Sequence, residues 1–261
     1  MPVTDAPALA RALYDARRTR VPIPPLTDAD PDLDMADGYA VQQELTRLLQ
    51  ADGDTIIGYK VGATSQPVQA MLGVDSPDYG PVWASTVYRD GDEIPLSRFI
   101  QPKMEAEIVF VLGERLEGPG VTVLQARQAI AGAVAGMEIV DSRIADWKIK
   151  LADTVADMAS NGAMAVSSRI VPIDDLDPRL IGVTLSRSGE LVETGAGAAA
   201  LGDPVAVVAW LANVLGGSGV ALEPGHLVMT GALHAMVPLA AGDVFRAEFD
   251  RLGPITVRVG A

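Results

Sequence analysis

The sequence contains no cysteine, and only 5% of its residues are aromatic. The absence of cysteine excludes disulfide bonds, thiolate metal sites and cysteine nucleophiles, and it fits a reducing compartment. Basic residues are scarce too: 20 Lys and Arg stand against 34 Asp and Glu, for a formal net charge of −14. This balance argues against nucleic-acid binding, and an anionic substrate would need a local Lys, Arg or metal ion to attract it.

Long hydrophobic runs are missing as well. We find no apolar run of the about 18 residues that a membrane span needs, and no signal-peptide core at the N-terminus. We therefore expect no membrane association and a cytoplasmic location. Hydrophobic residues still make up 49% of the chain, which is enough for a sizeable core.

The length of 261 residues fits one large domain, or a domain with a helical appendage. We expect residues 1–54 to form an N-terminal helical segment, with a helix over residues 4–20 and another after the N-cap residue Asp34. We expect residues 55–261 to form a β-rich metal-binding catalytic domain with one clear helix, which starts at Asp203-Pro204 and stops at Gly216-Gly217. The pattern also predicts a short helix through Val68, Met71 and Leu72, and strands over residues 166–170, 181–187, 244–249 and 255–259.

Two acidic residues stand one apart in Gln101-Pro102-Lys103-Met104-Glu105-Ala106-Glu107-Ile108-Val109-Phe110-Val111, a stretch that predicts a strand entering the core. Residues i and i+2 of a strand share a face, so Glu105 and Glu107 project together. Adjacent carboxylates repel each other unless a positive charge lies between them, and hard divalent cations prefer such oxygens. Glu138 is a third acid in an apolar strand-like run, where a lone charge is costly. The alternative is that the pair is merely the solvated face of an edge strand.

Lys60 and Asp78 are further candidates for a site. Lys60 lies in a short apolar strand between two glycines, Gly58 and Gly62, which permit close approach of backbone or ligand. It is either a lysine with a shifted pKa that contacts an anion, or an edge lysine whose ammonium reaches solvent. Asp78 lies in the turn-like stretch Asp75-Ser76-Pro77-Asp78-Tyr79-Gly80-Pro81, as an ordinary turn aspartate or as a site carboxylate on a loop.

The segment from Asp141 to Gly162 is rich in polar residues, yet it carries Trp147 and Met158. We interpret it as too polar for the core and expect a loop and a short helix that cover a site. The Gly- and Ala-rich link over residues 195–202 has no G-x-G-x-x-G pattern after a strand, so a dinucleotide site is not indicated.

Several short motifs recur in a recognisable order along nearly the whole chain. They are Gly58-Tyr59-Lys60-Val61-Gly62-Ala63-Thr64-Ser65, Asp78-Tyr79-Gly80, Pro102-Lys103-Met104-Glu105-Ala106-Glu107, Glu138-Ile139-Val140-Asp141-Ser142-Arg143-Ile144-Ala145-Asp146-Trp147, Asp153-Thr154-Val155-Ala156-Asp157, Leu201-Gly202-Asp203-Pro204, Ala209-Trp210-Leu211-Ala212-Asn213 and Thr230-Gly231. Each motif alone is weak, but their order and spacing together are specific. With them the chain resembles the fumarylacetoacetate hydrolase superfamily, and within it the branch of 2-hydroxypenta-2,4-dienoate (2-keto-4-pentenoate) hydratases and 4-oxalocrotonate decarboxylases.

The resemblance implies an α+β fold, mainly a β mixed-sheet roll or barrel of the fumarylacetoacetate hydrolase C-terminal type, with N-terminal helices beside it. It implies Mg²⁺ or Mn²⁺ held by Glu105, Glu107 and Glu138, with part of the coordination shell left open for a 2-oxo acid. It also implies a homo-oligomer, in complex with a pathway enzyme such as a decarboxylase or an aldolase.

The implied reaction is the addition of water to a 2-hydroxy-2,4-dienoate to give a 4-hydroxy-2-oxo acid, in meta-cleavage catabolism of aromatic compounds. Lys60 would place positive charge near the carboxylate or enolate, or move a proton, and Asp78 would be the general base. Ser160, Thr230 and Gly231 would bind the substrate.

Three alternatives remain open at this stage. The first is a decarboxylase of a 2-oxo-3-enedioate, and the second is a non-catalytic subunit that stabilises a decarboxylase partner. The third, a hydrolase of acylpyruvate type, wants a histidine near a glutamate, whereas the two histidines come late in the chain. One departure from the family pattern is Met158, where the family usually has Asn. If Met158 faces the pocket, the substrate preference shifts toward a more apolar tail.

Overall fold

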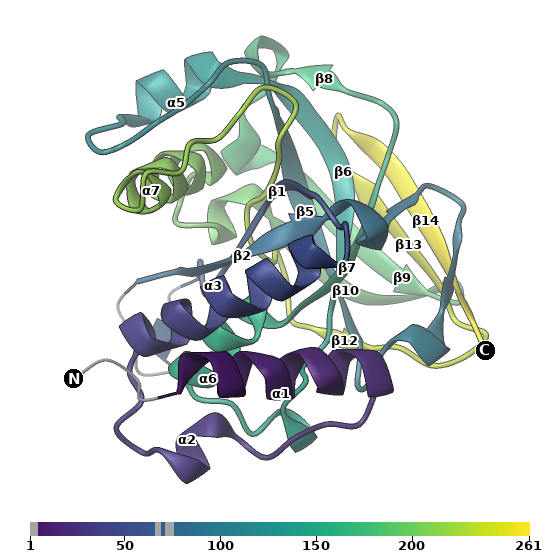
Figure 1. The fold of residues 1–261 in the computed structure, drawn as a ribbon. Helices are drawn as coiled ribbons and strands as arrows, with labels where there is room; N and C mark the ends of the chain where they lie inside the picture. Colours follow the sequence, from purple (N-terminus) through teal and green to yellow (C-terminus); the bar gives the residue numbers. More distant parts are fainter. Residues whose placement is uncertain (1–4, 66–68, 71–75) are drawn as a thin grey trace.

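The computed structural model describes residues 5–65, 69–70 and 76–261. Its described residues form two mixed β-sheets, with one group of helices at each end of the larger sheet (Figure 1). The helices are α1 Ala6–Thr19, α2 Leu26–Ala29, α3 Met35–Ala51, α5 Val123–Ala129, α6 Leu151–Ala156 and α7 Pro204–Gly216. The short helix expected through Val68, Met71 and Leu72 lies outside the described residues.

The larger sheet runs in the order β2-β1-β11-β5-β6-β7-β3, with β12 paired to β5 and β8 paired to β6. Its strands are β1 Ile56–Gly62, β2 Asp78–Trp83, β3 Val87–Arg89, β5 Lys103–Leu112, β6 Ile130–Val140, β7 Asn161–Val166, β8 Val171–Pro172, β11 Leu227–Met229 and β12 Val237–Pro238. The longest strands, β5 and β6, are antiparallel neighbours in the middle of the sheet, where both can bury a full face.

The smaller sheet runs in the order β10-β9-β13-β14-β4. Its strands are β4 Glu93–Pro95, β9 Gly182–Arg187, β10 Glu190–Ala196, β13 Val244–Phe249 and β14 Gly253–Gly260. Among the described strands, the two sheets remain separate. The expected mixed-sheet α+β roll is confirmed, but a closed barrel is wrong, because the larger sheet ends at β2 on one side and at β3 on the other.

The main hydrophobic core lies between the sheets and beneath α5 and α7. Met104, Ala106, Ile108 and Phe110, on the face of β5 opposite Glu105 and Glu107, are fully buried in it. The alternation of β5 therefore has an apolar face in the core and an acidic face on the other side, as its sequence predicts.

A second core joins the N-terminal helices to the rest of the chain. Leu13 of α1 and Leu45 of α3 pack there with Trp83, Ile144 and Met158. The N-cap of α3 is the one expected from the sequence, because Asp34 forms a capping box; Thr122 forms another at the start of α5. The division of the chain into residues 1–54 and 55–261 stays a prediction.

Two expectations from the sequence are wrong. Residues 166–170 are not one strand; β7 ends at Val166 and β8 begins at Val171. The segment from Asp141 to Gly162 contains the expected short helix, α6, but it is not too polar for the interior, because most of its second half is buried. Two of its charged residues, Arg143 and Asp157, form a buried ion pair, which the sequence pattern does not show.

One described stretch, Gly197–Gly216, is long and apolar enough to be a candidate membrane span, contrary to the expectation that no run reaches this length. Only 13 of its residues, Pro204–Gly216, form the α-helix α7. At 1.5 Å per residue such a helix spans about 20 Å, short of the about 30 Å of a bilayer core. Most side chains of α7 pack into the main core, which accounts for their hydrophobicity.

Candidate metal centre

Three carboxylates meet in the middle of the larger sheet. Glu105 and Glu107 project from one face of β5, and Glu138 lies directly opposite Glu105 on the neighbouring strand β6. One carboxylate oxygen from each of the three lies within 4.8 Å of the others. This spacing lets one small cation contact all three side chains.

The surroundings of these carboxylates favour a cation. Glu107 and Glu138 are fully buried, and Oε1 of Glu107 and Oε2 of Glu138 accept no hydrogen bond from the described residues. Burial, and then the charge of Glu138, raise the pKa of Glu105 to about 8 and that of Glu107 well above its ordinary value. Three buried acids this close together favour a cation between them, and oxygen ligands of this kind suit Mg²⁺ or Mn²⁺. The alternative of a solvated edge strand is wrong.

Lys60 supplies positive charge beside the carboxylates. Strand β1 lies between β2 and β11, and Lys60 is only 5% exposed, so it is not an edge lysine. Its Nζ lies 3.5 Å from Oε2 of Glu138 and donates a hydrogen bond to the carbonyl oxygen of Ala159 at 2.9 Å. Although burial works against its charge, Glu138 and then Asp78 raise the pKa of Lys60 above its ordinary value. Lys60 is therefore a fixed cation at neutral pH.

Asp78 is the first residue of β2 and is buried, so it is not a turn aspartate. Its partner across the β1–β2 ladder is Gly62. A Cβ on Gly62 would lie 2.3 Å from Oδ1 of Asp78 and 3.1 Å from Nζ of Lys60, so the glycine leaves room for both side chains. Oδ1 of Asp78 accepts no hydrogen bond from the described residues, and burial raises the pKa of Asp78 against the pull of Lys60. An unsatisfied carboxylate that readily holds a proton suits acid–base chemistry.

A tight turn after α6 closes over Lys60. Met158, Ala159 and Ser160 all adopt positive φ angles, between 51° and 56°, a backbone conformation that residues other than glycine rarely adopt. The turn lies against β2, where a Cβ on Gly80 would lie only 2.1 Å from the carbonyl oxygen of Met158. This close approach sets the carbonyl of Ala159 that accepts the hydrogen bond from Lys60.

A buried ion pair between Arg143 and Asp157 holds the backbone at the two ends of that turn. Arg143 donates to the Asp157 carboxylate through its backbone N–H and Nε, and to the carbonyl oxygens of Asp157 and Asn161 through its terminal nitrogens. Both charged side chains are almost completely buried. Asn161, the residue after the turn, donates from Nδ2 to Oε1 of Glu138 at 3.3 Å. Sequence reasoning quoted Arg143 and Asp157 as motif residues but assigned them no role.

The remaining predicted residues are placed as follows. The hydroxyl of Ser160 shares a hydrogen bond of 3.1 Å with that of Thr154, and the hydroxyl of Thr230 donates to the carbonyl oxygen of Ile108. The backbone N–H of Gly231 donates to Oε2 of Glu107 at 2.8 Å, so it orients that carboxylate. Gly231 lies in the loop after β11, so this contact depends on the path of that loop.

Met158 does not face this site. Its side chain is fully buried in the second core, where the indole N–H of Trp83 donates to its sulfur at 3.3 Å. The condition under which Met158 would shift the substrate preference, a side chain that faces the pocket, is therefore not met. The left-handed turn sends the side chain toward the N-terminal helices and sends the backbone of Ala159 toward Lys60.

Comparison with known proteins gives concordant results. The profile of the family described as fumarylacetoacetate (FAA) hydrolase C-terminal matches residues 55–260. The chain is 44% identical to a 2-keto-4-pentenoate hydratase of Paraburkholderia xenovorans over 246 residues, which cover 94% of this chain and 91% of that protein. It is 40% identical to a 2-hydroxyhexa-2,4-dienoate hydratase of Comamonas testosteroni, with 94% of each chain covered.

Among solved structures, a 4-oxalocrotonate decarboxylase from Pseudomonas putida G7, complexed with magnesium and adipate, superimposes with a TM-score of 0.95. That protein is 36% identical, and the match covers 98% of this chain and 97% of the other.

Proposed function

The chain belongs to the fumarylacetoacetate hydrolase family, and on that premise we propose that it is a divalent-metal-dependent hydro-lyase that adds water to a 2-hydroxy-2,4-dienoate. The product is a 4-hydroxy-2-oxo acid, and the reaction belongs to catabolism of aromatic compounds. The observation that carries the proposal is the complete set of three converging carboxylates with Lys60 and Asp78 beside them. Relatives with 40–44% identity over most of their length are named as hydratases of such dienoates.

A divalent cation, Mg²⁺ or Mn²⁺, would be held by Glu105, Glu107 and Glu138, and when bound it supplies Lewis acidity toward the oxygens of a 2-oxo acid. The residues fit this role because two of the three carboxylates have a buried oxygen without a hydrogen-bond donor. Gly231 and Asn161 hold two of the ligands through one hydrogen bond each, which fixes the direction of their remaining oxygens.

The protein residues would act on protons and charge. Ketonisation of the dienol moves a proton from the 2-hydroxyl group to C5, and water then adds its hydroxyl at C4 and its proton at C3. Asp78 is the base for the dienol or the water, because its Oδ1 is buried, unpaired and next to Lys60. Lys60 stabilises the negative charge that develops on the substrate, since its ammonium is held in place by Glu138 and Ala159. Ser160 and Thr230 would bind the substrate through their hydroxyl oxygens.

The second candidate is decarboxylation of a 2-oxo-3-enedioate, which is favoured by the structural match to a 4-oxalocrotonate decarboxylase. A non-catalytic stabilising subunit is a weaker reading, because such a role does not require three buried carboxylates. One assay separates all three: the purified protein is incubated with Mg²⁺ and either the dienol acid or the enedioate. A hydratase forms the 4-hydroxy-2-oxo acid without CO₂, a decarboxylase releases CO₂ from the enedioate, and a stabilising subunit does neither. Release of CO₂ without hydration would overturn the proposal.

We further propose a homo-oligomer in the cytoplasm, in complex with a pathway decarboxylase or aldolase. The exposed edge strand β10 supports self-association, since it carries Leu191 with 65% of its surface exposed and the neighbouring Val192. The absence of cysteine supports a reducing compartment. Light scattering after gel filtration tests the oligomer, and co-purification with each pathway enzyme tests the complex.

A further inference from the structure

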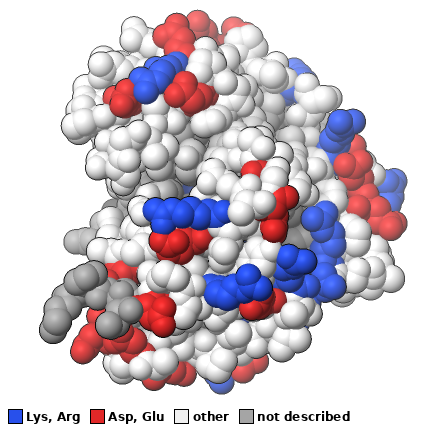
Figure 2. Space-filling model, in the orientation of Figure 1, with Lys and Arg blue, Asp and Glu red and all other residues white. Residues whose placement is uncertain are grey.

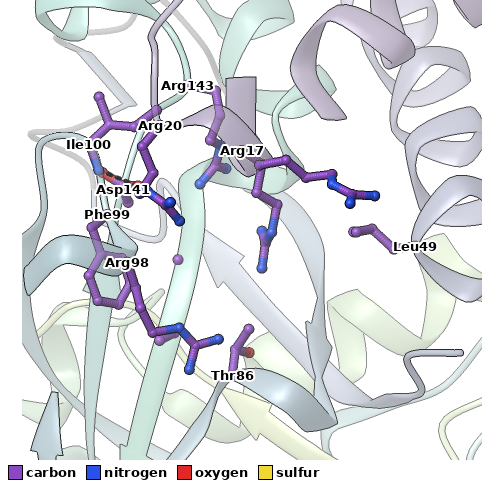
Figure 3. Close-up of a pocket in the computed structure, with 12 residues that line it drawn as sticks. Arg17, Arg20, Leu49, Thr86, Arg98, Phe99, Ile100, Asp141 and Arg143 are labelled. Atoms are coloured by element: carbon purple, nitrogen blue, oxygen red, sulfur yellow. Dashed lines mark hydrogen bonds between the residues drawn. The ribbon is translucent and has the colours of Figure 1, made fainter. Parts of the chain in front are cut away.

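A pocket lined by arginines lies away from the carboxylate centre, at the C-terminal end of α1. It has a volume of about 200 Å³. Figure 3 shows arginine side chains reaching it from α1, from Arg98 and from Arg143. Its charged lining residues are Arg17, Arg18, Arg20, Arg98, Asp141 and Arg143. Five of the 20 basic residues of an acidic chain thus surround one small space, and Figure 2 shows basic side chains grouped where α1 ends.

The acid that lines this pocket, Asp141, balances only part of the charge of its five arginines. Both oxygens of Asp141 accept hydrogen bonds from the backbone N–H of Ile100, and one also accepts from Gln101 (dashed in Figure 3 for Ile100). Arg143 forms an ion pair with Asp157, which is not itself a lining residue of the pocket. Arg18 has a distant acid partner in Asp52, at 3.9 Å.

Three arginines remain without an acid. Through their side chains, Arg17 and Arg20 make no hydrogen bond or ion pair with any residue that the structure describes. Arg98 donates only to neutral oxygens, those of Tyr88 and Ser85. Guanidinium groups seldom stay close together without an anion, because each raises the cost of charging the others.

Arg17 feels this cost most strongly. It is partly buried, and burial followed by the charge of Arg143 lowers its pKa to about 10, against the opposing pull of Asp157 and Asp141. At neutral pH it nevertheless stays charged. A partly buried cation that lacks a partner is a binding group for an anion that is not part of the chain.

We propose that this pocket is a second ligand site, which binds a small oxyanion with two negative charges through Arg17, Arg20 and Arg98. The volume admits a phosphate-sized ion or a short dicarboxylate and is too small for a folded partner. The donors are planar guanidinium groups, which match oxygen pairs of phosphate or carboxylate. The site is distinct from the carboxylate centre, because none of Glu105, Glu107 and Glu138 lines it.

The test is thermal denaturation of the full-length protein in increasing sodium sulfate, with sodium chloride used to keep the ionic strength constant. Parallel series with inorganic phosphate and with succinate distinguish an inorganic oxyanion from a dicarboxylate. The informative variant is Arg17→Gln. The matched control is Arg11→Gln, which removes the same charge from the same helix at an exposed residue paired with Asp15, outside the pocket.

We expect sulfate or phosphate to raise the melting temperature of the wild type and of Arg11→Gln in a saturable manner. In Arg17→Gln the apparent affinity should fall roughly tenfold or more, as one charge-assisted contact is lost. Without oxyanion, Arg17→Gln should melt no lower than the wild type, because it relieves an unpaired charge. An equal response of all three proteins, or no response beyond that to chloride, would overturn the proposal.

Discussion

Nζ of Lys60 lies 3.5 Å from Oε2 of Glu138, and both side chains are almost fully buried. The distance is that of an ion pair, yet Oε2 of Glu138 accepts no hydrogen bond in the described structure. The Lys60 ammonium donates one of its three N–H groups in a hydrogen bond to the carbonyl oxygen of Ala159. The carboxylate oxygen is therefore electrostatically balanced by Lys60 and still available to a cation.

From this relationship we predict that Lys60→Met lowers turnover about 100-fold or more, in the range expected when a positioned acid–base or charge-stabilising group is removed. Its affinity for Mg²⁺ should stay the same or rise, since a positive charge next to the cation site has been removed. Steady-state kinetics and calorimetric titration with Mg²⁺ measure the two effects. If turnover and metal were lost together, Lys60 would be a structural support of the metal site and not a group that acts on the substrate.

Asp78→Asn should lower turnover by a similar factor and change the pH profile. A base works only when ionised, and burial raises the pKa of Asp78 while Lys60 opposes the shift. Activity of the wild type should therefore fall, as the pH is lowered, at a pH above the about 3.9 of an ordinary aspartate. Tyr39 lies near Asp78 as well, but burial raises the pKa of Tyr39 above its ordinary value, so Tyr39 stays neutral in the acidic part of the pH profile. In Asp78→Asn the acid limb should vanish from the residual rate; its persistence would assign it to another group.

Much of the fold follows from local sequence. The period-two pattern of β5 predicts both its buried apolar face and the shared face of Glu105 and Glu107, because a strand leaves no other arrangement. The start of α7 at Pro204 follows from Asp203 as N-cap with proline after it. These features depend on residues adjacent in the chain.

Features that depend on distant residues could not be obtained in this way. Nothing in the local pattern shows that Arg143 and Asp157 neutralise each other in the interior, so their segment resembles a solvent-facing loop. Positive φ angles at Met158 and its two successors are equally invisible, because the turn is imposed by packing against Gly80. The direction of the Met158 side chain could not be predicted from the sequence for that reason.

Removal of the divalent cation should abolish turnover, and Mg²⁺ should restore it. For stability we predict that Glu107→Gln without cation melts no lower than the wild type, since burial and the neighbouring carboxylates already raise the pKa of Glu107 against its charged form, and Gln keeps an oxygen for Gly231. Saturating Mg²⁺ should stabilise the wild type by about 2.7 kcal/mol at 100 times the dissociation constant, and the variant hardly at all. Calorimetry with and without Mg²⁺ measures both. A chelator-treated wild type with full turnover would remove the cation from the reaction.

Gly80→Ala should disturb the turn that holds Lys60. The added Cβ would lie 2.1 Å from the carbonyl oxygen of Met158, so the turn must move. We expect a loss of about 1–3 kcal/mol in the free energy of unfolding, as for other overpacked sites, together with lower turnover. Gly182→Ala is the matched control in a strand, because its Cβ would meet no atom within 4 Å. Equal stability and turnover in the two variants would show that the turn tolerates displacement.

Asp157→Asn should be the most destabilising of these changes. Removing one partner of a buried ion pair leaves the other charge uncompensated, which costs about 3–5 kcal/mol. Here Arg143 would keep its carbonyl contacts with Asp157 and Asn161 but lose its anion. Asp177→Asn, in the exposed pair Asp177–Arg179, is the control, for which surface pairs predict about 1 kcal/mol or less. Chemical denaturation of both variants measures the difference.

The ion pair of Arg143 and Asp157 is costly to bury, since burial raises the pKa of Asp157 to about 6 in spite of the neighbouring arginine. A hydrophobic pair of equal volume would cost less, so net stability does not explain this arrangement. The geometry of the pair explains it. Arg143 donates hydrogen bonds to the backbone on both sides of the turn, and the Ala159 carbonyl in that turn accepts a hydrogen bond from Lys60. Under conditions where Asp157→Asn is still folded, it should therefore retain Mg²⁺ binding but turn over more slowly. A folded variant with wild-type turnover would show that the ion pair is dispensable for holding Lys60.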